Sequence, residues 1–99
     1  MVKNLNLTKK EIRQLDQLYV DSHRELIKLK NAVEREQFEL DTLLGKKTVD
    51  DAKVRKQFKR LENARTDLAN ERLGFVMGVR EIIGAERFQQ LKTSYKKWR

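Results

Sequence analysis

Apolar residues in the first half of the chain recur at alternating steps of three and four, which is the spacing of a heptad seam on one face of a helix. The ten seam positions are Ile12, Leu15, Tyr19, Ser22, Leu26, Leu29, Val33, Glu36, Leu40 and Leu43. All except Ser22 and Glu36 are apolar. After a short polar stretch, a second seam is formed by Val54, Phe58, Leu61, Arg65, Leu68, Arg72, Phe75, Val79 and Ile82. The two seams predict helices over about 9–44 and 49–83.

Residues with known preferences for helix ends bracket both seams. In "LTKKE", Thr8 is suited to the N-cap and Glu11, three residues later, completes a capping box. We expect Gly45 to end the first helix as a left-handed cap, and Thr48 to cap the second. Because the link over 45–48 is so short, the two helices must fold back as a long antiparallel hairpin.

A third helix is expected after Gly84, which interrupts the apolar pattern. Glycine is a poor residue inside a helix, so we interpret Gly84 as a left-handed cap that ends the second helix. A short C-terminal helix over about 85–97 follows, with its aromatic and apolar residues at helical spacing: Phe88, Leu91, Tyr95 and Trp98. The chain therefore reads as one all-α domain over 1–99.

Several apolar residues lie off both seams: Leu18, Ile27, Phe38, Leu44, Leu73, Val76, Met77 and Ile83. A hairpin of two helices cannot cover such a second stripe, so the third helix, a partner chain or a bound ligand must do so. Because symmetric pairs are the commonest oligomers, we expect an intertwined or cradle-like homodimer.

Composition supports long exposed helices, because hydrophobic and charged residues each make up 38% and proline is absent. The net charge is +8, and most of the excess lies in 48–99, where thirteen Lys/Arg stand against seven Asp/Glu. This balance favours an acidic partner: nucleic acid, an anionic membrane surface or an acidic protein segment.

Other features narrow the function class. With no cysteine, the chain has neither disulfides nor thiolate metal sites. No apolar run approaches the roughly 20 residues of a membrane helix, and the N-terminus lacks the apolar core of a signal peptide. The protein is thus cytoplasmic, or a mature fragment with an added start methionine. No catalytic motif is present, so we expect a protein that is not an enzyme.

Two short motifs carry a resemblance to a known family. "LTKKE" (7–11) and "IGAER" (83–87) resemble the paired LTxxQ-type motifs of the Spy/CpxP family of periplasmic proteins, which includes ZraP-like heavy-metal resistance and sensor proteins. The first copy has glutamate where glutamine is usual, and the second keeps the apolar residue and has glycine at the place of the threonine. The motif residues are Leu7, Thr8, Glu11, Ile83, Gly84 and Glu86.

The resemblance implies a curved, all-helical homodimer in the periplasm, with a signal peptide or membrane anchor removed. Chaperone members of the family hold unfolded clients without ATP on a surface that mixes basic and apolar residues. Metal-resistance members bind zinc, copper, nickel or cobalt, and some members act on an envelope signalling partner.

The candidate client-binding residues are Arg65, Arg72, Phe38, Leu73 and Met77. Arg65 and Arg72 occupy seam positions, where a buried arginine is costly unless it is paired. The simpler interpretation is a guanidinium at the rim, paired with carboxylates of the first helix, with Arg65 near Leu29. The alternative is that Arg65 and Arg72 line a cradle that attracts acidic client segments.

The candidate metal ligands are His23, Glu71 and Asp16. Hairpin pairing is expected to bring the single histidine near Glu71, and Asp16 lies seven residues earlier. A transition-metal site usually gathers several such ligands, so a rim histidine is the simpler interpretation. Where sensor members carry His and Met ligands, this chain has Phe75 and Val79, which counts against metal sensing.

The basic run over 53–60 is expected to be a solvated face, and no nucleic acid is expected as a partner because stacking aromatics are lacking. Tyr95 and Trp98, next to Lys96, Lys97 and Arg99, either dock the third helix onto the hairpin or touch an anionic membrane surface or a client. Three functions follow: a Spy/CpxP-like stress chaperone, a heavy-metal binding or sensing domain of the same fold, and a basic cytoplasmic coiled-coil scaffold.

Overall fold

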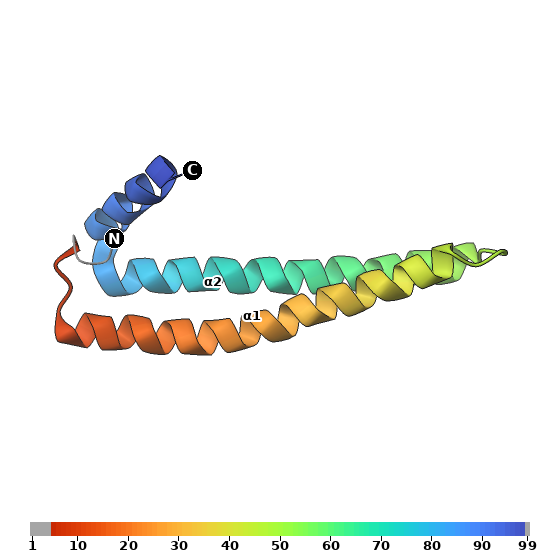
Figure 1. Ribbon diagram of the computed structural model, residues 1–99, viewed down its shortest axis with the longest axis horizontal. Coiled ribbons are helices and arrows are strands. Elements are labelled where there is room, and N and C mark those ends of the chain that lie inside the picture. Colours follow the sequence, from red (N-terminus) through yellow and green to blue (C-terminus); the bar gives the residue numbers. More distant parts are fainter. Residues whose placement is uncertain (1–4, 99) are drawn as a thin grey trace. The chain divides into compact units, whose positions relative to one another are not determined.

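The computed structural model describes the backbone of residues 5–98 and the side chains of residues 5–92. Two long helices, α1 (Lys9–Leu44) and α2 (Asp51–Trp98), are joined by a turn, and no strand occurs in the described backbone. The two helices run in opposite directions (Figure 1). Side-chain hydrogen bonds from Gln57 to Glu36 and from Arg87 to Glu11 connect them. The all-α helical hairpin expected from the two seams is confirmed, while the homodimer remains a prediction.

The start of α1 is fixed by the expected capping box. The Thr8 amide donates to Glu11 Oε1 at 3.0 Å, and the Glu11 amide donates to Thr8 Oγ1 at 3.1 Å. Two amides that would otherwise lack a partner are satisfied reciprocally. The first helical turn is therefore specified by two residues of "LTKKE".

The turn between the helices differs from the expectation at both ends. Gly45 does not take up a left-handed conformation; its amide instead bonds to the Asp41 carbonyl at 2.9 Å and extends the helical pattern. The N-cap of α2 is Asp50 rather than Thr48, because Asp50 Oδ1 accepts the Lys53 amide at 3.2 Å. Both are good cap residues, but the carboxylate also interacts favourably with the positive helix terminus.

The chain divides into two compact units, each described here by itself. The motif unit comprises Met1–Ser22 and Leu73–Arg99, and the turn unit comprises His23–Arg72. In the turn unit the core residues are Leu40, Leu61 and Leu68, and in the motif unit they are Leu5 and Ile83. The polar seam positions Ser22 and Glu36 are also buried, as their places in the heptad require.

Side-chain exposure corrects the seam prediction at several positions. Ile12, Tyr19 and Phe58 occupy seam positions but are exposed, because two helices cover only the centre of a wide apolar stripe. Of the off-seam residues, Ile27, Phe38, Leu44, Leu73, Val76 and Met77 are exposed, as expected for a stripe that a hairpin cannot cover. Two off-seam residues differ: Leu18 is half-buried, and Ile83 is only 2% exposed.

Helix α2 is kinked at Gly84, which has φ 84° and ψ 160° (Figure 1). The positive φ of Gly84 was expected. The prediction of a left-handed helical cap was wrong, because that conformation has ψ near about +47° and Gly84 has ψ 160°. The observed pair lies in a region that is essentially restricted to glycine. The segment after the kink is helical to Trp98, whereas the docking of Tyr95 and Trp98 lies outside the described side chains.

Candidate functional site at the paired motifs

The two motif copies meet through an ion pair in the motif unit. Arg87, the last residue of "IGAER", points both terminal nitrogens at the carboxylate of Glu11, the last residue of "LTKKE". Nη1 donates to Oε1 at 2.8 Å, and Nη2 donates to Oε2. A two-pronged guanidinium–carboxylate bond of this kind fixes orientation as well as distance. Glu11 therefore caps α1 and holds the second motif.

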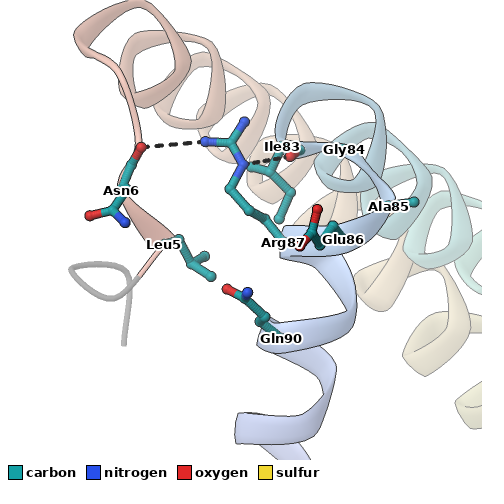
Figure 2. Close-up of a pocket in the computed structure, with 8 residues that line it drawn as sticks. All are labelled: Leu5, Asn6, Ile83, Gly84, Ala85, Glu86, Arg87 and Gln90. Carbon is teal, nitrogen blue, oxygen red and sulfur yellow. Dashed lines mark hydrogen bonds between the residues drawn. The ribbon is translucent and has the colours of Figure 1, made fainter.

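Arg87 also donates to two backbone carbonyls, one just before the kink and one in the segment that precedes α1. Its Nε donates to the carbonyl of Ile83 at 2.7 Å, and its Nη1 reaches the carbonyl of Asn6 at 3.5 Å (Figure 2). The Ile83 carbonyl precedes the non-helical Gly84, where the helical pattern is broken. One side chain thus compensates the kink and attaches it to the N-terminal segment.

The electrostatics of the pair follow from these bonds. The Arg87 guanidinium, followed by the Thr8 amide, lowers the pKa of Glu11 from 4.5 to about 2, against a smaller opposing effect of burial. The same pair raises the pKa of Arg87. Both groups are therefore charged throughout the ordinary pH range, and Glu11 is not a proton donor or acceptor near neutrality.

A hollow of about 590 Å³ lies beside the ion pair. The residues that line it are Leu5, Asn6, Ile83, Gly84, Ala85, Glu86, Arg87 and Gln90 (Figure 2). Leu5 and Gln90 extend toward it from opposite sides, while Glu86 carries an exposed carboxylate at its edge. Its lining combines hydrogen-bonding groups, apolar side chains and one carboxylate, that of Glu86, so the hollow is equipped for polar and apolar contact.

A second polar cluster occupies the seam of the turn unit. Gln57 Nε2 donates to both the side-chain Oε1 and the main-chain carbonyl of Glu36, each at 2.9 Å. Arg60 and Arg35 approach the same carboxylate at 3.4 and 3.7 Å from exposed positions. The Gln57 amide, followed by Arg60 and Arg35, lowers the pKa of Glu36 against its burial. The buried carboxylate is therefore ionised and satisfied.

The five residues predicted to bind clients are all exposed, and they are divided between the two units. In the motif unit, Leu73 and Met77 stand one turn apart on α2. In the turn unit, Arg65 donates to Glu62 Oε1 at 2.9 Å and to Gln37 Oε1 at 3.2 Å. Gln37 precedes Phe38, which is 68% exposed. Arg65 therefore pairs with a carboxylate of its own helix and with the Gln37 amide of α1, whereas the expected partners were carboxylates of the first helix. Its expected place near Leu29 stays a prediction.

Arg72 is exposed in the turn unit, and its client role stays a prediction. The predicted metal ligands are divided between the units, with Asp16 in the motif unit and His23 and Glu71 in the turn unit. Among the described side chains, no group of three or more His, Cys, Asp or Glu residues is arranged to hold a metal ion. Metal binding by His23, Glu71 and Asp16 stays a prediction.

Sequence reasoning did not identify Arg87, Asn6 or Gln57 as site residues. A signal for Arg87 was available, because it ends the second motif copy with a charge opposite to that of Glu11. Asn6 has a positive φ of 53°, which asparagine tolerates better than most residues. No comparable sequence signal exists for Gln57, since its pairing with Glu36 depends on helix register.

Comparison with known proteins yields a family. No curated protein and no solved structure gives a significant match to the chain. The sequence profile described as heavy-metal resistance matches residues 3–90, and this family includes Spy/CpxP-like and ZraP-like helical proteins. The resemblance carried by the two motifs is thereby confirmed. The chain belongs to the heavy-metal resistance family.

Proposed function

We propose that this protein is a chaperone-like stress protein that binds unfolded or acidic client segments without ATP. The observation that carries the proposal is the exposure of large apolar side chains on an otherwise satisfied fold. Leu73 and Met77 are 57% and 60% exposed and follow one another on the same face of α2. Exposed apolar patches on a soluble fold commonly mark sites for other polypeptides.

Basic side chains accompany the exposed apolar ones. Arg80 is exposed three residues after Met77, and therefore continues the face formed by Leu73 and Met77. In the turn unit, Arg65 is bonded to Gln37, next to the exposed Phe38. Apolar surface bordered by guanidinium groups favours segments that combine hydrophobic and acidic residues.

The cellular setting of the proposal follows from the family. Proteins of the heavy-metal resistance family are typically periplasmic, and the family is not one of enzymes. None of the helices in the described part of the chain is both long and apolar enough to cross a bilayer. We propose a periplasmic, non-catalytic protein that works as a homodimer, alone or with an envelope signalling partner.

Suppression of aggregation tests the chaperone proposal. A chemically denatured client is diluted at low salt into buffer with near-stoichiometric amounts of the protein, and light scattering is followed. We expect the wild type to suppress scattering and the Leu73→Ser/Met77→Ser double variant to lose most of that activity. Because both side chains are exposed, this change should leave the far-UV circular dichroism intact.

Val20→Ser supplies the matched control, since Val20 is an exposed apolar residue of the same unit on α1. It should suppress scattering as well as the wild type does. Wild-type protein without effect on scattering would refute the proposal. Equal losses for Val20→Ser and the double variant would show that the activity does not depend on the Leu73–Met77 face.

A heavy-metal binding or sensing role is the second candidate, and family membership favours it. The ligands would be His23, Glu71 and Asp16, with no transition-metal thiolate because cysteine is absent. Calorimetric titration with Zn²⁺, Cu²⁺ and Ni²⁺ should give binding heat that His23→Ala abolishes. Traces that are flat for both proteins would eliminate this role.

A further inference from the structure

The turn unit carries a second surface that the proposed function does not use. Between residues 44 and 60 the chain has seven Lys/Arg and two Asp. We name as the lysine tip five lysines and three exposed apolar residues of this stretch: Lys46, Lys47, Lys53, Lys56, Lys59, Leu44, Val49 and Phe58. All of these side chains are exposed, and they flank the turn at which α1 gives way to α2.

The acidic residues of the stretch are already engaged. Asp50 caps α2 by accepting the Lys53 amide, and Asp51 accepts from Arg55 Nε at 2.8 Å. By contrast, none of the five lysines of the tip forms an ion pair with a described carboxylate. The positive charge of the tip is therefore left uncompensated by the protein itself.

The apolar residues of the tip are open to a partner. Leu44 and Phe58 line a groove of about 920 Å³, whose charged lining residues are the bases Arg55 and Lys59 and the acids Asp51 and Glu62. Val49 stands in the turn itself and is about half exposed. Apolar side chains thus lie among the lysines rather than behind them.

We propose that the lysine tip binds anionic membrane surfaces. Lysines without fixed partners suit a diffuse layer of lipid phosphates, and the apolar side chains can enter below the headgroups. A single weak apolar anchor does not hold a protein at a membrane, but an anchor combined with a basic cluster does. Nucleic acid would neutralise the lysines but leave Leu44 and Val49 in water.

The exposed apolar patch of the motif unit lacks this character. Leu73, Val76 and Met77 are flanked between residues 71 and 81 by two arginines and two glutamates, so that stretch has no net charge. An extended anionic surface is therefore attracted more strongly to the tip, where seven Lys/Arg stand against two Asp, than to that patch. The membrane proposal is independent of client binding.

Vesicle co-sedimentation tests the proposal on the full chain. Wild-type protein should pellet with vesicles of phosphatidylglycerol and phosphatidylcholine but not with pure phosphatidylcholine, and added salt should release it. Each lysine near an anionic surface strengthens binding roughly fivefold, so Lys46→Gln/Lys47→Gln should weaken binding by at least about tenfold. Lys9→Gln/Lys10→Gln changes the charge equally at exposed positions of the motif unit and should have less than about a twofold effect.

The apolar part of the tip is tested separately. Leu44→Asn/Val49→Asn should weaken vesicle binding severalfold while leaving its salt dependence unchanged. Because the chain has no cysteine, Thr48→Cys can carry an environment-sensitive fluorophore without altering the tip lysines. Its emission should rise and shift to the blue with phosphatidylglycerol vesicles, whereas the same label on Lys9→Cys should not respond.

Three outcomes would overturn the proposal. The first is wild-type protein that remains in the supernatant with phosphatidylglycerol vesicles at low salt. The second is an equal loss of binding in the Lys9/Lys10 and Lys46/Lys47 variants. The third is binding to soluble polyglutamate as tight as to vesicles and insensitive to Leu44→Asn/Val49→Asn, which would identify the tip as a site for acidic polypeptides.

Discussion

Two glutamates at helix–helix contacts, Glu11 in the motif unit and Glu36 in the turn unit, are held in different ways. The side chain of Glu11 is 18% exposed and receives two bonds from Arg87. That of Glu36 is 10% exposed and receives its main bond from the neutral amide of Gln57. The motif unit is therefore connected by paired charge, whereas the turn unit combines a neutral donor with a leucine core.

The arginines near Glu36 are mainly in water, because Arg60 and Arg35 are 63% and 66% exposed. Exposed ion pairs of this kind contribute little to stability. Stability in the turn unit should therefore depend on buried leucines, and in the motif unit on the bonds around Arg87 and on the backbone at Gly84. The following predictions test this difference, from the largest expected effect to the smallest.

Removing the central leucine of the turn unit should have the largest effect. Leu61 is only 1% exposed, so Leu61→Ala leaves a cavity and should lower the free energy of unfolding by about 2–5 kcal/mol. Urea unfolding followed by circular dichroism measures the loss. Hydrogen exchange should rise first in residues 23–72.

Leu73→Ala is the control, because Leu73 is exposed and its truncation should change stability by less than about 0.5 kcal/mol. If the two variants lost equal stability, burial would not be what distinguishes Leu61. If exchange rose equally in both units, the leucine core would not belong to the turn unit alone.

Gly84→Ala should have the next largest effect, and it acts on the motif unit. The conformation at φ 84° and ψ 160° is unfavourable for any residue with a Cβ, at a cost of about 1–3 kcal/mol. Apart from Gly84 itself and its two chain neighbours, no atom lies within 4 Å of the position that a Cβ would occupy, so the cost arises from the backbone and not from a clash. Urea unfolding should show the loss, and a neutral result would mean that the kink is not strained for alanine.

Much of the fold could be predicted because it depends on local pattern. Heptad spacing gave the extent of both helices, and "LTKKE" gave the capping box, since both are determined within a few residues. The positive φ of Gly84 followed from glycine interrupting a helical run. These features require no knowledge of how distant parts of the chain meet.

The sequence-based predictions failed where neighbouring residues were equally suitable for the same role. They also failed where the register between the two helices determines which residues meet. Thr48 and Asp50 are both suitable caps, and only the structure distinguishes them. The bond from Arg87 to Glu11 spans 76 positions, so no local pattern specifies it. A shift of one residue in the pairing of the helices would likewise remove Gln57 from Glu36.

Acid should weaken the motif unit through Glu11. A pKa lowered to about 2 in the folded state means that the stabilising charge is fully present above the ordinary pKa of 4.5. The stabilisation by the Glu11–Arg87 pair is lost progressively as the pH falls from about 5 toward 2, because a protonated Glu11 no longer carries the charge that pairs with Arg87. Thermal melts across this range should show a falling Tm for the wild type.

Substituting Glu11 or Glu36 one at a time distinguishes the contributions of the two units to the pH dependence of Tm. Glu11→Gln removes the charge that Arg87 requires and should lower Tm at pH 7 while flattening the acid dependence. Glu36→Gln keeps an oxygen acceptor for Gln57, so its effect should be smaller. A larger effect of Glu36→Gln would contradict the contrast between paired charge and neutral donor.

The smallest effects are expected at two glycines of α2 that lie four residues apart. At Gly74 a Cβ would meet nothing within 4 Å, so Gly74→Ala should stabilise the helix by about 0.5–1 kcal/mol. At Gly78 the same Cβ would lie 2.9 Å from Leu18 Cδ2, and the leucine side chain must move. The helical gain should then be offset, leaving Gly78→Ala near zero.

A double-mutant cycle tests whether this contact is the reason for the difference. Leu18→Ala removes the obstructing atoms, so Gly78→Ala should recover about 0.5–1 kcal/mol in that background, measured by urea unfolding. Gly74→Ala should give the same gain with or without Leu18. If Gly78→Ala stayed neutral after Leu18 was truncated, the close approach of Leu18 would not explain a glycine at this position.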